Sequence, residues 1–131
     1  MSERTLRDCR VLIVEDEYML ADELQIELED AGAVVLGPVG DLTDATALIE
    51  AEQPIDGAIL DANLGGEMVF PAADLLMERN VPIVFTTGYD ASIIPSRFST
   101  VPLCEKPIKM KRVVQAIGQA LKASAAGEVP R

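Results

Sequence analysis

The sequence predicts an α/β protein built on a doubly wound parallel sheet. Short apolar runs alternate with amphipathic helical patterns five times along the chain, which is typical of a parallel sheet with helices on both faces. The apolar runs are nearly continuous, as expected for strands that are covered on both faces. Most of them end in charged or hydroxyl residues. Because ligands of such sheets bind outside the carboxyl ends of the strands, these ends are the candidate site.

Three strands and two helices are expected in the first half of the chain. The strands are residues 10–15, 33–39 and 55–61, and the helices are residues 17–31 and 42–51. Leu20, Leu24 and Leu28 recur at helical spacing in the first helix. Asp41 is a suitable N-cap for the second helix, and Pro54 ends it.

Prolines shape the second half of the chain. The expected elements are a helix over residues 71–79, strands over 81–86 and 100–104, and a helix over 109–124. Pro71 fits the first turn of its helix, which leaves residues 65–70 as a loop or frayed turn. Pro102 weakens its strand because it lacks a ladder donor. Pro95 interrupts any helix between residues 88 and 99, so that element is expected to be short or irregular.

The length of 131 residues suits a single domain. We expect a loose polar lead-in over residues 1–8, the domain over residues 9–124, and a disordered tail over residues 125–131. No apolar run approaches a membrane span and no signal-peptide pattern opens the chain, so a cytoplasmic protein without a membrane partner is expected. Cys9 and Cys104 are too few for a disulfide framework and are expected to be buried thiols.

The charge of the chain is acidic, with a formal net charge of -11 at pH 7. An acidic body argues against a nucleic-acid partner, and the short basic end is better explained as a solvated helix face. The sequence contains no histidine. A histidine phosphocarrier, a histidine-ligated metal site and a histidine general base within this chain are therefore excluded.

Polar residues follow four of the expected strands. They are the acidic pair Glu15-Asp16, Asp61, the hydroxyl pair Thr86-Thr87 and Lys106. If the strands are parallel, all of these lie at one edge of the sheet. Oxygen ligands for a hard cation would then stand beside a hydroxyl and an ammonium group suited to phosphoryl oxygens, which is a magnesium and phosphoryl site in outline. Asp61 on its own would be better explained as a turn residue.

The chain resembles the receiver domain of bacterial two-component response regulators. The matching residues are Glu15-Asp16, Asp61 with Asn63 two positions later, Thr87, and Lys106-Pro107. Each motif is weak alone, but their order and spacing match the family across essentially the whole chain. The resemblance implies a flavodoxin-like five-stranded sheet of order 2-1-3-4-5, here with a short or irregular fourth helix.

The resemblance also implies a magnesium site. Its ligands would be the carboxylates of Asp16 and Asp61 and the backbone carbonyl of Asn63. Glu15 would bind the ion either directly or through a water molecule. It is longer by one methylene than the aspartate that is common at that position in the family. An acidic helix entry favoured by the helix dipole is the structural alternative for Glu15 and Asp16.

The phosphoryl chemistry is implied in the same way. Asp61 would accept a phosphoryl group from a histidine kinase and form an acyl phosphate. Thr87, rather than Thr86, matches the family hydroxyl that contacts the phosphoryl group, and the two threonines face opposite ways on a strand. Lys106 would pair with Asp61 before phosphorylation and with the phosphoryl group afterwards, and its bond to Pro107 would be cis.

The switch region departs from the common receiver pattern. Leu103 stands three positions before the lysine, where many receivers carry a tyrosine or phenylalanine. The run from Phe85 to Tyr89 resembles a subset of stand-alone receivers with a Phe-x-Thr-Gly signature. We hypothesise that Gly88 loosens the loop and that Tyr89 supplies the moving aromatic ring. The alternative is that Tyr89 is an amphipathic residue at the rim.

The expected function is that of a single-domain response regulator in a phosphorelay. It would signal by phosphorylation-dependent protein contact or act as a phosphoryl sink, and it would catalyse only its own phosphoryl transfer and dephosphorylation. An alternative is an aspartyl-nucleophile phosphatase, although Asn63 stands where such enzymes need a general acid. A receiver module excised from a larger kinase is a further alternative. The sequence names neither the kinase nor the output partner.

Overall fold

The computed structural model describes residues 6–52, 54–88 and 91–125. Its centre is a five-stranded sheet of order β2-β1-β3-β6-β7, in which every neighbouring pair is parallel. The strands are β1 (Arg10–Val14), β2 (Val34–Val39), β3 (Gly57–Asp61), β6 (Ile83–Thr87) and β7 (Leu103–Glu105). This order is the predicted 2-1-3-4-5, so the fold class is confirmed.

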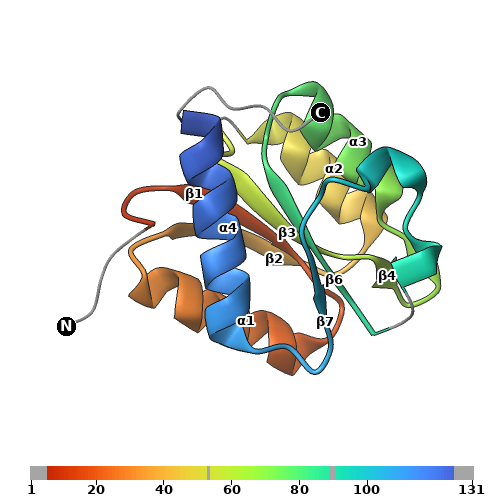
Figure 1. Ribbon diagram of the computed structural model, residues 1–131, viewed down its shortest axis with the longest axis horizontal. Helices are drawn as coiled ribbons and strands as arrows, with labels where there is room; N and C mark the ends of the chain where they lie inside the picture. The colour runs from red at the N-terminus through yellow and green to blue at the C-terminus, as the bar shows by residue number, and fades with distance from the viewer. Residues whose placement is uncertain (1–5, 53, 89–90, 126–131) are drawn as a thin grey trace.

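Helices cover both faces of the sheet. They are α1 (Tyr18–Asp30), α2 (Leu42–Ala51), α3 (Phe70–Glu78) and α4 (Met110–Ala125). Helices α1 and α4 lie on one face, and α2 and α3 lie on the other (Figure 1). In the described parts of the chain, no helix is long and apolar enough to cross a lipid bilayer.

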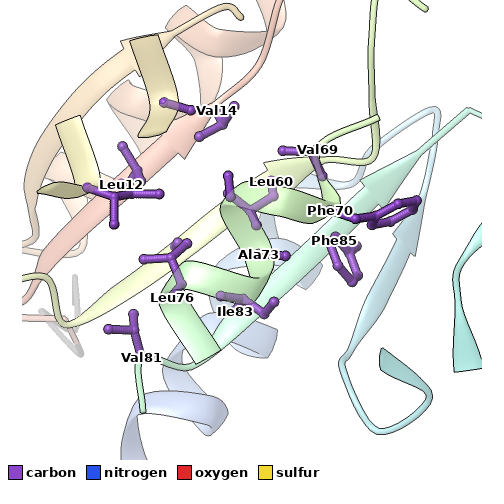
Figure 2. Close-up of a cluster of buried hydrophobic side chains, with 14 of the residues drawn as sticks. Leu12, Val14, Leu60, Val69, Phe70, Ala73, Leu76, Val81, Ile83 and Phe85 are labelled. Atoms are coloured by element: carbon purple, nitrogen blue, oxygen red, sulfur yellow. The ribbon is translucent and has the colours of Figure 1, made fainter. Parts of the chain in front are cut away.

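Alternation of side chains along the strands divides the core into two layers. Leu60 of β3 and Phe85 of β6 point toward α2 and α3, where they meet Phe70 and Leu76 (Figure 2). The residues next to them in sequence, such as Ile59, pack on the opposite face against α1 and α4. Each central strand is therefore buried on both sides, which explains its unbroken apolar sequence.

Local signals set several helix ends. Helix α2 has the predicted bounds, and the Asp41 side chain accepts a hydrogen bond of 2.7 Å from the Asp44 N–H at its start. Pro71 lies in the first turn of α3, as expected. In β2, Gly37 has a φ of +86°, and a Cβ atom there would lie 2.9 Å from the Val39 nitrogen. Glycine is therefore required at this irregular point of the strand.

Two sequence-based expectations are wrong. The stretch expected to be loop before α3 contains a small antiparallel hairpin, β4 (Asn63–Leu64) and β5 (Glu67–Met68), which turns through Gly65 and Gly66 at positive φ. The lead-in is not loose from residue 6 onward. Leu6 is fully buried, and its N–H donates a 3.0 Å hydrogen bond to the Ala31 carbonyl. A single apolar residue in a polar stretch gives no periodic signal, although it fills the core at the end of α1.

The connection between β6 and β7 is irregular, as predicted. It contains two 3-10 turns, η1 (Ala91–Ile93) and η2 (Ser96–Phe98), in place of a longer helix. Tyr89, the hypothesised moving aromatic residue, lies outside the described residues. Strand β7 has only three residues and begins after Pro102. Cys9 and Cys104 are free thiols and are half-buried.

Candidate functional site

The carboxyl ends of β1, β3 and β7 bring the predicted polar residues to one edge of the sheet. A surface pocket there is lined by Asp16, Asp61, Asn63 and Lys106 together with Gly65, Gly66 and Gly88. Gly65 turns the β4-β5 hairpin next to the acids, and a Cβ atom at this position would lie 3.5 Å from Asp16 Oδ2. The hairpin that the sequence did not reveal therefore forms one wall of the site.

Asp61 is the last residue of β3, and only 3% of its surface is exposed. Its Oδ1 accepts a 3.2 Å hydrogen bond from the Asn63 N–H, and its Oδ2 accepts a 3.0 Å bond from Lys106 Nζ. Burying a carboxylate this deeply is costly unless such donors pair with it. Lys106 supplies the compensating charge, and its bond to Pro107 is cis, as the family resemblance implied.

Three carboxylates converge beside Asp61. One carboxylate oxygen from each of Glu15, Asp16 and Asp61 lies within 4.8 Å of the others. Glu15 is 3% exposed, and its Oε2 accepts a 3.0 Å hydrogen bond from the Glu17 N–H. Its Oε1 is buried and has no hydrogen-bond partner in the described parts of the chain. Its nearest cation is Lys106 Nζ at 3.5 Å, so this oxygen has an ion-pair contact but no hydrogen bond. Three converging carboxylates of this kind fit a hard divalent cation.

The charges of the site shift the pKa values of two groups. Burial raises the pKa of Glu15 to about 8, and the negative charge of Asp61 adds to this shift. Burial lowers the pKa of Lys106, but Asp61, Glu15 and Glu17 together outweigh it, so the net shift is upward. The Lys106 Nζ lies 3.5 Å from an oxygen of Glu15 and 3.5 Å from an oxygen of Glu17. The site therefore has an excess of negative charge that one ammonium group only partly offsets.

The two threonines occupy different places at the end of β6. Thr86 is the register partner of Asp61, and Thr87 ends the strand opposite Glu105. Both threonines are fully buried. The Thr87 carbonyl accepts a 2.7 Å hydrogen bond from the Lys106 N–H, but Thr87 is not among the described residues that line the pocket. The structure thus brings Asp61, the acids, Asn63 and Lys106 together, and contact between the Thr87 hydroxyl and a phosphoryl group stays a prediction.

An aromatic cluster near the site was not identified from the sequence. Phe98 of η2 is 1% exposed and packs against Phe85 and Phe70, with ring centroids 5.3 and 5.5 Å apart. Arg97 lies over the Phe98 ring and makes a two-pronged salt bridge to Asp74 of α3, with both distances 3.0 Å. These contacts hold the end of the β6–β7 connection against the body of the protein. The one hint of this cluster in the sequence is that Phe98 is the only aromatic residue between residues 91 and 99.

Glu17 also contributes to the site, although the sequence did not indicate it as a candidate. It follows the acidic pair directly, and its backbone and side chain both contact site residues. Its position after Glu15-Asp16 was visible, but an exposed glutamate before a helix has an ordinary explanation as a helix-entry residue. The 3.5 Å distance from a Glu17 oxygen to Lys106 Nζ shows that Glu17 is also part of the charged site, which the sequence alone did not indicate.

The fold and sequence match known regulators. No family model matches the chain. SdrG from Sphingomonas melonis Fr1 is 40% identical over 88% of this chain and 97% of SdrG, with a TM-score of 0.76. The BeF3-activated conformation of SdrG, from Pseudomonas melonis Fr1, aligns with 38% identity and a TM-score of 0.71, over 92% of this chain and 99% of that one.

Two further matches are regulators by their descriptions, and the first is described as a receiver protein. A response regulator receiver protein from Sinorhizobium medicae WSM419 is 25% identical over 90% of this chain and 98% of that chain, with a TM-score of 0.78. The phyllosphere-induced regulator PhyR of Methylorubrum extorquens is 34% identical over 85% of this chain and 43% of PhyR. The chain spans about half the length of the curated relatives it matches. Since SdrG matches along nearly its whole length and the receiver fold is shared throughout, the chain belongs to the receiver-domain family of bacterial two-component response regulators.

Proposed function

We propose that this chain is a single-domain response regulator that accepts a phosphoryl group on Asp61 from the phosphohistidine of a histidine kinase. The observation that carries this proposal is the environment of Asp61. It is a buried carboxylate at a strand end, bonded to Lys106 and surrounded by the other acids of the site. Its place at the carboxyl edge of the sheet is where α/β proteins of this topology bind ligands.

The proposed cation is Mg²⁺, held by the carboxylates of Asp16 and Asp61 and the backbone carbonyl of Asn63. Glu15 would hold the ion directly or through water, and its unsatisfied Oε1 supports a place beside the cation. When bound, the ion offsets the repulsion between the Asp61 carboxylate and the incoming phosphoryl oxygens. Magnesium usually keeps several waters and takes only one or two protein carboxylates, which suits this open pocket.

In the proposed transfer, an oxygen of Asp61 attacks the phosphorus atom. The new O–P bond forms as the P–N bond of the phosphohistidine breaks, and the electron pair of that bond stays on the imidazole nitrogen. Lys106 moves its ammonium from Asp61 to a phosphoryl oxygen. The Thr87 hydroxyl donates to another phosphoryl oxygen, which draws the end of β6 toward the site.

The output would be a phosphorylation-dependent contact with another protein, or removal of phosphoryl groups as a sink. The near-complete match to the length of SdrG supports a stand-alone role. The partial coverage of PhyR supports a form of the excised-module alternative in which the longer protein is a regulator and not a kinase. The phosphatase alternative has less support, because the Asn63 side chain accepts a 2.6 Å hydrogen bond from the Gly66 N–H and so braces the hairpin turn.

The test of the acceptor is phosphorylation by acetyl phosphate in the presence of Mg²⁺, followed by intact-protein mass spectrometry. Asp61→Asn keeps the shape of the side chain and should abolish the acid-stable, base-labile phosphoryl adduct. Asp22→Asn on the exposed face of α1 is the matched control and should label like the unmodified protein. Full labelling of Asp61→Asn would show that the acceptor is another residue.

A further inference from the structure

Thr86 has a buried hydroxyl that the proposed function leaves unexplained. The residue is fully buried, and its Oγ1 has no hydrogen-bond partner among residues 6–52, 54–88 and 91–125. Most buried polar groups in native proteins are paired, because an unpaired hydroxyl loses its bonds to water without replacement. A valine would fill the same space without this penalty. We therefore expect the Thr86 hydroxyl to have a hydrogen-bond partner in another state of the protein.

Register places this hydroxyl beside the acceptor. Thr86 is paired with Asp61 on one neighbouring strand and with Cys104 on the other. Side chains at paired positions of parallel strands stand on the same face of a sheet, so Thr86 lies between Asp61 and Cys104 on the face covered by α1 and α4. Lys106, two residues beyond Cys104, belongs to the same face.

The Lys106 side chain passes the end of β6 at Gly88. It starts beyond β7 and reaches Asp61 on β3, so it must pass over the strand that lies between them. Its Cδ lies 3.8 Å from the place of a Cβ atom at Gly88, two residues after Thr86. Thr86 therefore belongs to the strand end that the Lys106 side chain passes, in register with Asp61.

Asp61 is not hydrogen-bonded to Thr86 in the resting state. Each oxygen of Asp61 already accepts a hydrogen bond, one from the Asn63 N–H and one from Lys106 Nζ. In the proposed phosphorylated state, Lys106 moves to the phosphoryl group and its bond to Asp61 is lost. When Oδ1 carries the phosphoryl group, Oδ2 remains as the carbonyl oxygen of the acyl phosphate and can accept a hydrogen bond from a new donor at the position that Lys106 has left.

We propose that Thr86 is a positioning residue whose hydroxyl donates a hydrogen bond to the Asp61 carbonyl oxygen once the acyl phosphate has formed. This inference rests on the proposed function of Asp61. It assigns the two threonines of β6 to different groups, Thr87 to the phosphoryl oxygens and Thr86 to the acceptor side chain. The hydroxyl that is unpaired at rest becomes paired in the phosphorylated state, which favours that state.

The experiment compares Thr86→Val, which removes the hydroxyl at nearly constant volume, with Thr86→Ser, which retains it. Thr46→Val on α2 is the matched control, because its hydroxyl bonds only to backbone carbonyls of its own helix. Three quantities are measured: resistance of the resting protein to chemical denaturation, affinity for beryllofluoride with Mg²⁺, and the C=O stretching frequency of the acyl phosphate by difference infrared spectroscopy.

For Thr86→Val we expect the resting protein to be as stable as the unmodified one or more stable, since no hydrogen bond is lost there. Beryllofluoride should bind about fivefold more weakly, which corresponds to one neutral hydrogen bond. The C=O stretch should move to higher wavenumber, because the oxygen has lost its donor. Thr86→Ser and Thr46→Val should match the unmodified protein in beryllofluoride affinity and C=O stretch.

Unchanged affinity and an unchanged C=O stretch in Thr86→Val, with normal binding by the unmodified protein, would overturn the role of Thr86 and leave the proposed function standing. Equal loss of resting stability and of affinity would also overturn it, since that is the result of a merely structural role. If the unmodified protein binds no beryllofluoride at all, the proposed function of Asp61 fails, and this inference fails with it.

Discussion

The sheet face covered by α2 and α3 packs three phenylalanine rings, whereas the described core on the face covered by α1 and α4 is wholly aliphatic. The aromatic face holds η2 through Phe98. The aliphatic face carries the proposed acceptor Asp61 and its register partner Thr86 at its polar end. Strand β6 contributes to both, because Phe85 points to one face and Thr86 to the other.

This difference separates packing from charge. On the aromatic face, stability comes from buried rings and should depend little on pH or magnesium. On the aliphatic face, we expect the carboxylates at the polar end to make stability depend on both pH and magnesium. A change at the acceptor can reach the aromatic cluster through β6, since Phe85 and Thr87 are two residues apart on one face of that strand. Single substitutions on each face can test this separation.

Phe98→Ala should lower the free energy of unfolding by about 3–4 kcal/mol, because it removes a fully packed ring from contact with Phe70 and Phe85. Urea denaturation at pH 6 and pH 9, with and without Mg²⁺, measures this cost. The loss should be the same in all four conditions. Phe98→Leu is the milder control and should lose less. A cost that changes strongly with pH or Mg²⁺ would break the separation between the two faces.

Asp16→Ala should weaken Mg²⁺ binding by about a hundredfold, and Glu15→Ala by about tenfold. The reason is that Asp16 stands at the exposed mouth of the pocket, whereas Glu15 is longer and already engages the Glu17 N–H. Isothermal titration of the metal into each variant gives the two affinities. Equal losses, or a larger loss in Glu15→Ala, would contradict this ranking.

Glu15→Gln should stabilise the metal-free protein at high pH. The folded-state pKa of Glu15 is raised from its usual 4.5 to about 8, so its contribution to stability is present below pH 4.5 and is lost as the pH rises through 8. At pH 9 the wild-type carboxylate is a buried charge with incomplete pairing, and the neutral amide should gain about 1–2 kcal/mol.

The sign of the Glu15 effect is checked by denaturation of both proteins from pH 4 to pH 9 in the presence of a chelator. The two stability curves should converge at low pH, where Glu15 is protonated. If Glu15→Gln is no more stable than the wild type at pH 9, Lys106 pairs with Glu15 better than the 3.5 Å distance indicates.

Arg97→Lys should have the smallest effect on stability, because the salt bridge to Asp74 is about half-exposed on both sides. Lysine keeps the charge but cannot form the two-pronged bond. Hydrogen exchange should therefore quicken at η2 while α1 and α4 remain protected as before. Faster exchange across the whole sheet would show that the salt bridge supports more than the end of the β6–β7 connection.

Local patterns predicted the fold well where the signal lies within one element. The bounds of α2 followed from the Asp41 cap and the proline after it, and the sheet order followed from the family resemblance. The β4-β5 hairpin was missed because strands of two residues have no measurable alternation. The burial of Leu6 and the Phe98 cluster were missed because both depend on contacts between segments far apart in the sequence.

The candidate site was predictable as a set of strand-end residues, because parallel strands bring their ends to one edge. The sequence gives residue types but not distances. It could not show that Lys106 contacts three acids, or that Thr86 lies in register with Asp61 without a partner for its hydroxyl. Tyr89 lies outside the described residues, so its proposed movement stays a prediction.

The irregular strand β2 limits how other proteins can bind at the edge of the sheet. It forms one margin of the sheet, and Pro38 leaves a gap in its row of backbone donors. The opposite margin, β7, is only three residues long. Neither margin offers a continuous template on which a foreign strand could extend the sheet. The proposed kinase and output partner would therefore be recognised through side chains on helices and loops, where single substitutions can change the choice of partner.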